Sequence, residues 1–494
     1  MSAIKNNKNV AVGIHVGPSY TRLSTAAFVL STTGNAFNVT PSVVSNALGS
    51  RSTPSIVTVD ANTEGAVVIG EAAKKNVMRE SSNADNKGEV VKTNSYLKKL
   101  SNGDNADSLH FFGMLKELAA ETSGVGMKGA DRLKCVLAVP AGAGQAEVDR
   151  LVEAAGAGFN KPTSFIGVLS EPAAVCVAHG LTGSHTNSHT PSWSTAIVID
   201  WTATGLTATL VKRVGSSDLI QLGASKTDNE VNAESLVDLM MGHCATMFKR
   251  KTGGDVWESK KAIAKLRIVC ETAVRTLDRG ASATVEADGL VDGMDLRVPV
   301  SKPRWEMLSG SVVAKGKEFI SSLAEGVKVD VCLMSGSVCA MPSVKAMVTG
   351  LFEGAWQGLG NVACEEAVAV GCAVQACLMV EAGIEESGAG LKGQNIDVEV
   401  AEEVKIGLAK VEGDKVDENS IKVIVGDGTA VGVEVAGFLA GLNKGDAAAV
   451  VDMNDGNKIL VKIDDCDEGE LKVGIRLGKE GGVVVRVGEG EIAC

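Results

Sequence analysis

Aromatic residues are scarce in this chain, at 3% of its 494 residues, although hydrophobic residues of all kinds make up 45%. A core with this composition has to be packed mainly from small aliphatic side chains. The length exceeds that at which one hydrophobic core keeps growing, so two or three domains are expected. Positive charge is also in deficit, because 48 Lys and Arg face 60 Asp and Glu, a net charge of −12. This balance argues against nucleic acid as a direct partner.

Cysteine pairs with metal-binding spacing are lacking as well. The eleven cysteines include no Cys-x-x-Cys pair, which suits buried thiols in a reducing compartment. His185 and His189 lie in a Ser- and Thr-rich run with no cysteine nearby, which favours a solvated loop over a zinc site. The longest apolar run, 367–380, is too short to cross a bilayer, and the polar residues 1–9 do not resemble a signal peptide. We therefore expect a cytoplasmic protein that contacts no membrane.

Two stretches of similar design stand out among what is present. Residues 10–23 and 196–210 each contain an apolar strand, a turn of small residues and a second strand. Two such hairpins, about 190 residues apart, suggest two related lobes that face each other. Turns of small residues after a buried strand are places where backbone N–H groups can face a phosphate.

Strands alternate with helices up to about residue 382, which indicates an α/β domain with a mixed or parallel sheet. Helices are expected at 109–122, 145–157, 233–251, 259–278, 304–323, 342–352 and 365–382.

The last fifth of the chain has a different pattern and a different charge. Residues 383–394 are rich in Gly, Glu and Ser and indicate a linker. Beyond them the period becomes two, which is typical of a small antiparallel sandwich. From Ile396 to Cys494, 11 Lys and Arg face 21 Asp and Glu, so 11 − 21 = −10 of the net charge belongs to this region. Strands are expected at 422–425, 431–435, 447–451, 458–463, 471–477 and 483–487, with no helical segment after them.

Short motifs along the chain occur in the order and spacing of a known family. They are Gly13–Tyr20, Ser52–Ser55, Ile69–Lys74, Val139–Ala141, Glu171–Ala174, Ile199–Asp200, Arg275–Leu277 and Glu366–Gly371. Together they make the chain resemble the DnaK-type 70-kDa heat-shock protein (Hsp70) family of chaperones. The resemblance implies an α/β actin-like ATPase fold of the ribonuclease H-like kind, with two lobes that grip a nucleotide. A small all-β sandwich would follow, without the helical lid of the family.

The resemblance also implies domain boundaries. The nucleotide-binding domain would span 9–383, with lobe I at about 9–193 plus 360–383 and lobe II at about 194–359. A flexible linker would span 384–395, and a truncated β-sandwich like the family's substrate-binding domain would span 396–494.

Residues at the family's functional positions can be assigned one by one. Lys74 matches a catalytic lysine, Glu171 matches a glutamate on the magnesium side, and Asp200 matches the aspartate of the second hairpin. They are the residual catalytic candidates, and ATP is the implied cofactor. An alternative is that these three persist as buried pairs that hold the site together. The positions that imply nucleotide contacts are Gly17, Ser19, Tyr20, Gly205, Glu271, Arg275, Gly336 and Ser337.

Several positions depart from the family pattern at the places where phosphate and metal would bind. His15 stands where the family has an aspartate near the magnesium-bound phosphates, and imidazole is a poor partner for that hard cation. Pro18 removes a backbone N–H, and the segment 202–204 replaces three glycines with larger residues. Mg²⁺ is therefore a poor fit, and no metal ligand is assigned. We expect nucleotide binding to survive better than hydrolysis, and enzyme activity is left open.

With few residues after the linker, the chain is similar to the short subunit of the ribosome-associated complex, which pairs with a zuotin-type J-domain protein. The resemblance implies an atypical chaperone subunit in a heterodimer with a J-domain co-chaperone, contacting the ribosome indirectly and assisting nascent polypeptides during translation. The alternative is an active ATP-hydrolysing chaperone with a divergent site. A sugar kinase or actin-like filament protein would share the lobes, but it would not explain the β domain.

Overall fold

The computed structural model describes most of the chain between residues 9 and 381 and the strands that follow it. The described residues are 9–30, 37–59, 67–74, 76, 108–159, 165–181, 191–213, 220–381, 406–412, 415–416, 422–425, 434–440, 447–452, 458–462, 470–477, 483–487 and 490–493. The predicted linker lies outside these ranges.

The first sheet is mixed, and its centre is the first predicted hairpin. Strand β1 (Val10–Val16) pairs antiparallel with β2 (Tyr20–Leu30) and parallel with β7 (Leu133–Val139). The order is β3-β2-β1-β7-β8, with the short β4 attached to β2. The remaining strands are β3 (Phe37–Val43), β4 (Thr53–Pro54) and β8 (Phe165–Ser170), and a separate pair is formed by β5 (Val57–Val59) and β6 (Val67–Ile69).

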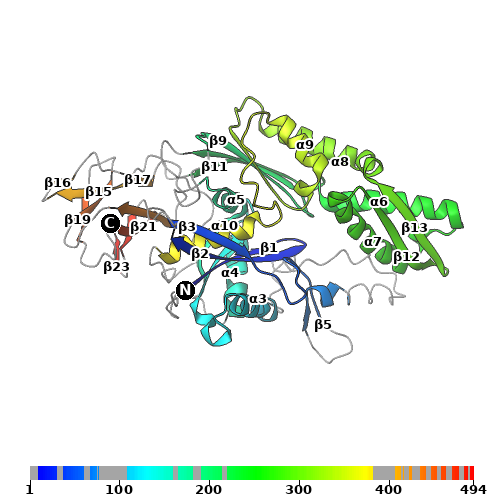
Figure 1. Ribbon diagram of the computed structural model, residues 1–494, viewed down its shortest axis with the longest axis horizontal. Helices are drawn as coiled ribbons and strands as arrows, with labels where there is room; N and C mark the ends of the chain where they lie inside the picture. The colour runs from blue at the N-terminus through cyan, green and yellow to red at the C-terminus, as the bar shows by residue number, and fades with distance from the viewer. Residues whose placement is uncertain are drawn as a thin grey trace.

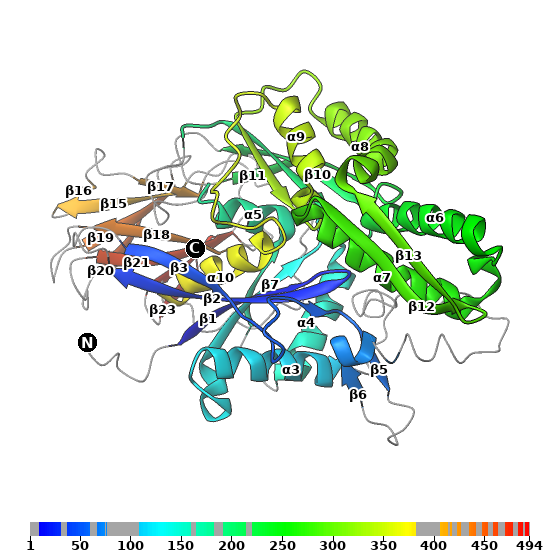
Figure 2. The ribbon, with the colours of Figure 1, turned by 45° about the vertical axis from the view of Figure 1, so that its right-hand side comes forward.

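Helices cover both faces of this sheet, as expected for an α/β arrangement (Figures 1 and 2). Helices α3 (Ser108–Thr122) and α4 (Gln145–Phe159) share a hydrophobic core with one face. Helices α5 (Glu171–Ala178) and α10 (Ala367–Glu381) pack on the other face. Their core also includes residues of the second sheet, so α5 and α10 lie between the two sheets.

The second sheet is built on the second predicted hairpin. Strand β9 (Thr195–Trp201) pairs antiparallel with β10 (Leu206–Arg213) and parallel with β14 (Val331–Ser335). Strand β11 (Ile220–Asp228) completes the order β11-β10-β9-β14. The other elements here are α6 (Ala233–Thr252), α7 (Lys260–Arg279), β12 (Ser282–Val291), β13 (Met294–Ser301), α8 (Lys302–Leu323) and α9 (Pro342–Leu351), with short 3-10 turns η1 (Met127–Arg132), η3 (Val256–Glu258) and η4 (Val338–Ala340).

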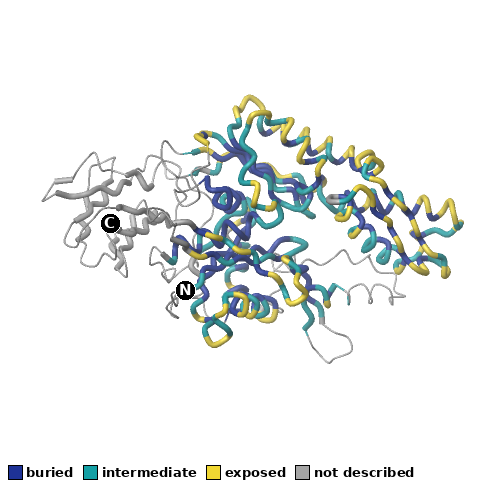
Figure 3. Tube along the Cα trace, viewed as in Figure 1, coloured by how far each residue is buried: buried dark blue, intermediate teal, exposed yellow. Residues whose placement is uncertain are grey.

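Buried residues concentrate in the two sheets and in the helices between them, whereas the outer helices are exposed on one side (Figure 3). The helices expected from the sequence are confirmed, with shifts of a few residues at their ends. Residues Asp292 and Gly293 form the turn between β12 and β13, where both have positive φ. This mixed α/β architecture is consistent with an actin-like ATPase fold.

Antiparallel strands follow in the C-terminal region, as the period of two predicted. They form two sheets, ordered β16-β15-β19-β20, with β17 beside β15, and β18-β21-β22-β23. The expected strand at 431–435 is displaced to 434–440, and three further strands, at 406–412, 415–416 and 490–493, have no counterpart among the predicted ones. The bounds are β15 (Ile406–Glu412), β16 (Lys415–Val416), β17 (Lys422–Val425), β18 (Glu434–Ala440), β19 (Ala447–Asp452), β20 (Lys458–Lys462), β21 (Glu470–Leu477), β22 (Val483–Val487) and β23 (Gly490–Ala493).

Candidate functional site

The two hairpins carry their polar residues at matching positions. His15 is the second-last residue of β1, and Asp200 is the second-last residue of β9. Each strand is paired with a parallel neighbour on one side and with its own hairpin partner on the other. The fold therefore presents one polar side chain from each hairpin where the strand ends.

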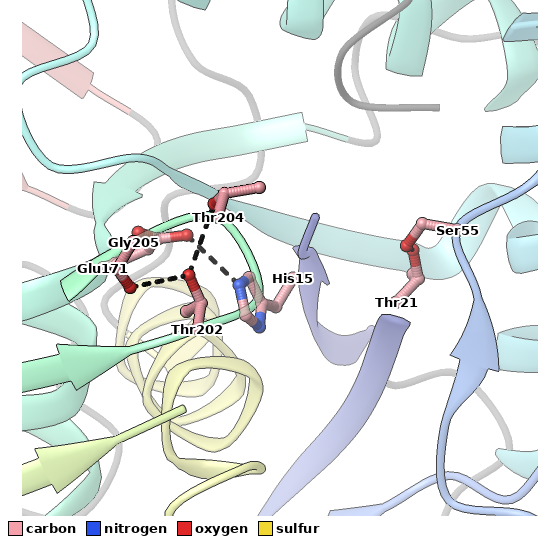
Figure 4. Close-up of polar contacts among 7 residues, drawn as sticks. All are labelled: His15, Thr21, Ser55, Glu171, Thr202, Thr204 and Gly205. Carbon is pink, nitrogen blue, oxygen red and sulfur yellow. Dashed lines mark hydrogen bonds and ion pairs between the residues drawn. The ribbon is translucent and has the colours of Figure 1, made fainter. Parts of the chain in front are cut away.

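His15 is bonded to a carboxylate from the adjoining helix (Figure 4). Its Nε2 lies 3.2 Å from Glu171 Oε1, and the residue is only 8% exposed. Glu171 is the first residue of α5, where the helix dipole favours a negative charge. The other ring nitrogen, Nδ1, is buried and has no hydrogen-bond partner. Glu171, which the sequence assigned to the magnesium side, is thus paired with the residue that departs from the family pattern.

Asp200 lies beside the same pair. Burial raises the pKa of its carboxyl group, and the nearby Glu171 raises it further. A hydrogen bond with Ser335, followed by the attraction of His15, acts in the opposite direction. Ser335 ends β14, directly opposite Asp200 in the strand register. We refer to His15, Glu171, Asp200 and Ser335 as the strand-end cluster.

The turn of the second hairpin is closed by its own hydroxyl groups. Thr202 Oγ1 donates to the Gly205 carbonyl at 3.3 Å and lies 3.4 Å from Thr204 Oγ1 (Figure 4). The Thr202 N–H also donates to the Gly205 carbonyl, at 2.9 Å. A Cβ on Gly205 would lie 2.9 Å from the Asp228 carbonyl oxygen, so close packing against β11 accounts for this glycine.

A second group of side chains links the start of β2 to helix α7 of the second sheet. Lys74 Nζ lies 3.0 Å from Glu271 Oε2 and donates to Tyr20 Oη at 3.4 Å. The guanidinium carbon of Arg275 lies 4.2 Å from the centre of the Tyr20 ring, a distance suited to a cation–π contact. We call Tyr20, Lys74, Glu271 and Arg275 the bridging cluster.

The bridging cluster engages the lysine that matches the family's catalytic lysine. Burial acts to lower the pKa of Lys74, but the attraction of Glu271, and then of Tyr20, outweighs it and raises the pKa. Lys74 is therefore held in its charged form by a partner 197 residues away in the sequence. The sequence pattern assigns Lys74 and Glu271 to separate roles, and neither residue's local pattern carries a signal of this pairing.

The remaining predicted contacts have packing explanations of their own. A Cβ on Gly17 would lie 2.7 Å from the Tyr20 carbonyl oxygen, and the carbonyl of Ser19 accepts from Ser55 N–H at 2.9 Å. Gly336 has φ of 88° and lies so close to β9 that a Cβ would overlap the backbone of Trp201. Ser337 precedes η4, and its carbonyl accepts from Ala340 N–H at 3.2 Å.

Other contacts fix the first hairpin and were not anticipated. Thr21 Oγ1 and Ser55 Oγ are hydrogen-bonded at 2.8 Å (Figure 4). This bond connects β2 to the segment after β4. Arg22 forms an ion pair of 3.3 Å with Glu365, and Arg51 forms one of 3.1 Å with Glu366. The Ser52–Ser55 motif is a sequence signal for the first contact. Glu366 begins the Glu366–Gly371 motif, whereas Glu365 lies outside every motif.

No group of three or more His, Cys, Asp and Glu side chains that could hold a metal ion occurs in the described part of the chain. Within the same residues, no helix is long and apolar enough to cross a membrane.

Comparison with known proteins identifies a family and several relatives. A family model described as Hsp70 protein matches residues 113–387. A ribosome-associated molecular chaperone of Zygosaccharomyces rouxii is 27% identical over 252 residues, which cover 50% of this chain and 39% of that protein. Heat shock 70 kDa protein 14 of Danio rerio is 29% identical over 277 residues, covering 54% and 51% respectively.

A longer but weaker match is heat shock 70 kDa protein 14 of Bos taurus, which is 24% identical over 459 residues, covering 85% of this chain and 82% of that protein. The chain thus spans about half or less of the first two relatives and most of the third. Because the family model covers more than half of the chain, the chain belongs to the Hsp70 family.

Proposed function

We propose that this protein is an atypical Hsp70-type chaperone subunit that binds ATP without hydrolysing it at a useful rate. The observation that carries the proposal is that two side chains which hydrolysis would need are paired with other protein side chains. Glu171 is hydrogen-bonded by His15, and Lys74 is paired with Glu271. Phosphoryl transfer depends on placing charged groups around the reacting phosphate, and both groups are committed to other side chains.

Nucleotide binding has separate support. Membership of the Hsp70 family implies a nucleotide-binding domain, and the expected contact residues Tyr20, Glu271 and Arg275 meet in the bridging cluster. Arg275 is exposed on α7, so its charge is available to a ligand. A few such contacts are worth a few kcal/mol in total.

Mg²⁺ does not fit the residues present. The ion prefers an octahedral shell of oxygen ligands, whereas the strand-end cluster offers an imidazole already bonded to Glu171 and an aspartate bonded to Ser335. No other cluster of metal-ligand type occurs among the described residues. We therefore assign no step to a metal ion.

The proposed partner is a J-domain co-chaperone of the zuotin type, through which the subunit would contact the ribosome and assist nascent chains. One relative, from Zygosaccharomyces rouxii, is named as a ribosome-associated chaperone, which supports a role at the ribosome. The charge of −10 in residues 396–494 suits a basic ligand. Among the described strands, β20 and β23 each have one neighbour, so an extended segment of a partner could add beside them.

Nucleotide binding is tested by titrating ATP into the purified full chain. We expect Arg275→Ala to weaken binding about tenfold, or about 1.4 kcal/mol. Lys261→Ala, an exposed change on the same helix, should leave the affinity unchanged. No measurable binding to the folded wild-type chain would overturn this part of the proposal.

The partner is tested by purifying the tagged full chain from cells that produce it naturally. We expect a J-domain protein in equal amount, and ribosomes in a salt-sensitive fraction. Recovery of the chain as a monomer with neither would contradict the heterodimer.

The alternative of an active ATPase is favoured by one observation, the presence of Lys74, Glu171 and Asp200 together in the chain. This alternative requires Lys74 to break its ion pair with Glu271 when a nucleotide binds.

A further inference from the structure

The hydrogen bond between His15 and Glu171 also affects the net charge of the strand-end cluster. Close carboxylates repel one another, and at 4 Å the repulsion reaches about 4 kcal/mol for a pair near a protein surface. With a carboxylate at position 15, the strand-end cluster would hold three such groups, at positions 15, 171 and 200. Three acids in one place need a cation before a triphosphate can approach.

His15 removes that need in two ways. It replaces one of the three acids with a neutral or positive ring, and its Nε2 is hydrogen-bonded to Glu171. A Cβ on Gly17 would lie 3.3 Å from His15 Cε1 and 3.4 Å from Nε2. The ring therefore lies directly beneath the first turn, which is where the sequence pattern predicts a phosphate.

The other ring nitrogen has no protein partner. His15 Nδ1 is buried and unpartnered in a residue that is 8% exposed. Native structures rarely leave a buried polar atom without a partner, because doing so is costly. A phosphate oxygen can accept a hydrogen bond from Nδ1 only when the ring carries a proton on both nitrogens, because Nε2 donates to Glu171. A metal ion bound to Nε2 would compete with the bond to Glu171.

We propose that this chain binds adenine nucleotide without a divalent metal ion, and that His15 takes the electrostatic place that a metal ion would otherwise fill. The inference rests on the proposed nucleotide binding. It adds the ionic form of the ligand, which is the free nucleotide rather than its magnesium complex. Positive charge near the turn comes from Arg275, whose guanidinium lies over the ring of Tyr20 at the start of β2.

The test measures the affinity of the full-length chain for ATP in magnesium buffer and in EDTA. We expect the wild-type affinity to change by less than about threefold, and no Mn²⁺ to be retained when manganese replaces magnesium and bound metal is followed by electron paramagnetic resonance. His15→Asp should bind at least about tenfold more weakly in EDTA than in magnesium, and should retain Mn²⁺ together with ATP.

His15→Gln is the matched control, because the glutamine amide can occupy the place of Nε2 and donate to Glu171 without adding a carboxylate. It should be as insensitive to EDTA as the wild type, and circular dichroism should show both variants folded. Wild-type binding that falls tenfold in EDTA and retains Mn²⁺ would overturn this inference while leaving nucleotide binding intact. A folded wild-type chain that binds ATP in neither buffer would overturn both.

Discussion

The β1–β2 and β9–β10 hairpins share one backbone design and carry different chemistry. Each begins with a buried strand that has a parallel neighbour, β7 or β14, and each places a polar residue second from the strand end. That residue is His15 in one hairpin and Asp200 in the other. Strand pairing and packing fix the backbone, whereas the side chain at the strand end can change without disturbing either. Under the proposed function, the two hairpins keep one framework and differ in the side chain that each presents.

The packing behind the two hairpins also differs. Behind β1, helix α10 approaches so closely that a Cβ on Gly13 would overlap the backbone of Ala369. Behind β9, the indole of Trp201 reaches α8 and would be overlapped by a Cβ on Gly316. Backbone cannot move aside without shifting a whole helix, whereas a side chain can. An added methyl group should therefore be tolerated less well behind the first hairpin than behind the second.

The largest effect is expected for Gly13→Ala, because the added methyl group would meet backbone atoms of α10. The free energy of unfolding should fall by more than about 4 kcal/mol, or the chain should not fold. Gly156→Ala, in α4 of the same unit and with open space around it, should be neutral or slightly stabilising. Urea denaturation compares the two, and equal stability of both variants would refute the close approach of α10.

Helix α5 is followed directly by the buried His179. We expect this histidine to make the folded chain less stable at acid pH. His179 Nδ1 accepts from Leu359 N–H at 2.9 Å, and burial lowers its pKa to about 4. The folded chain then binds fewer protons than the unfolded chain between pH 6.5 and 4. The stabilisation is complete above pH 6.5 and is lost as the pH falls towards 4, by about 3 kcal/mol in all.

The variant His179→Gln isolates this contribution, because an amide oxygen can accept the same hydrogen bond without titrating. Unfolding free energies at pH 7 and pH 4.5 should differ less for the variant than for the wild type. Identical pH dependence of the two proteins would show that His179 is not held neutral.

A smaller effect is expected for Gly316→Ala, where the added methyl group meets the indole of Trp201. Overpacking of this kind costs about 2 kcal/mol, since the ring can shift in part. The control is Gly310→Ala in the same helix, which has no atom within 4 Å of the added Cβ. Thermal denaturation should separate the pair. If Gly316→Ala proved as damaging as Gly13→Ala, the proposed difference between the hairpins would be wrong.

The last comparison is between variants of the two strand-end residues, Asp200 and His15. Burial, and then Glu171, raise the pKa of Asp200, so its ionised form destabilises the folded chain as the pH rises above the usual aspartate range. Asp200→Asn should therefore raise the free energy of unfolding at pH 8. The gain should disappear below pH 4, where both states hold the proton.

His15→Gln, at the matching position, should change stability by less than about 0.5 kcal/mol, because the bond to Glu171 can be kept. Chemical denaturation at pH 8 measures both variants. A loss of stability in Asp200→Asn would show that the ionised carboxylate is stabilised rather than strained.

Much of this arrangement follows from local sequence patterns. The two hairpins, the alternation of strands and helices, and the turn at Asp292 were predictable, because periodicity and turn residues act over short distances. Strand β15 was missed because its Gly and Ala residues weaken the strand signal, and β18 was predicted a few residues too early.

The partners of the functional residues could not be predicted in the same way. Glu271 is paired with Lys74, and Ser335 bonds to Asp200, across long stretches of chain. Local patterns contain no information about such pairs, which depend on how the two sheets come together. The replacement of an acid by His15 was visible in the sequence, but its bond to Glu171 was not.

The central claim is that the nucleotide is held but not cleaved. Single-turnover incubation of excess protein with ATP labelled on its terminal phosphate tests it most directly. We predict that the label is recovered as intact ATP from the wild-type chain, with no phosphate release above that of Lys74→Ala. Release of phosphate from the wild type at a rate that Lys74→Ala abolishes would contradict the account and establish an active ATPase.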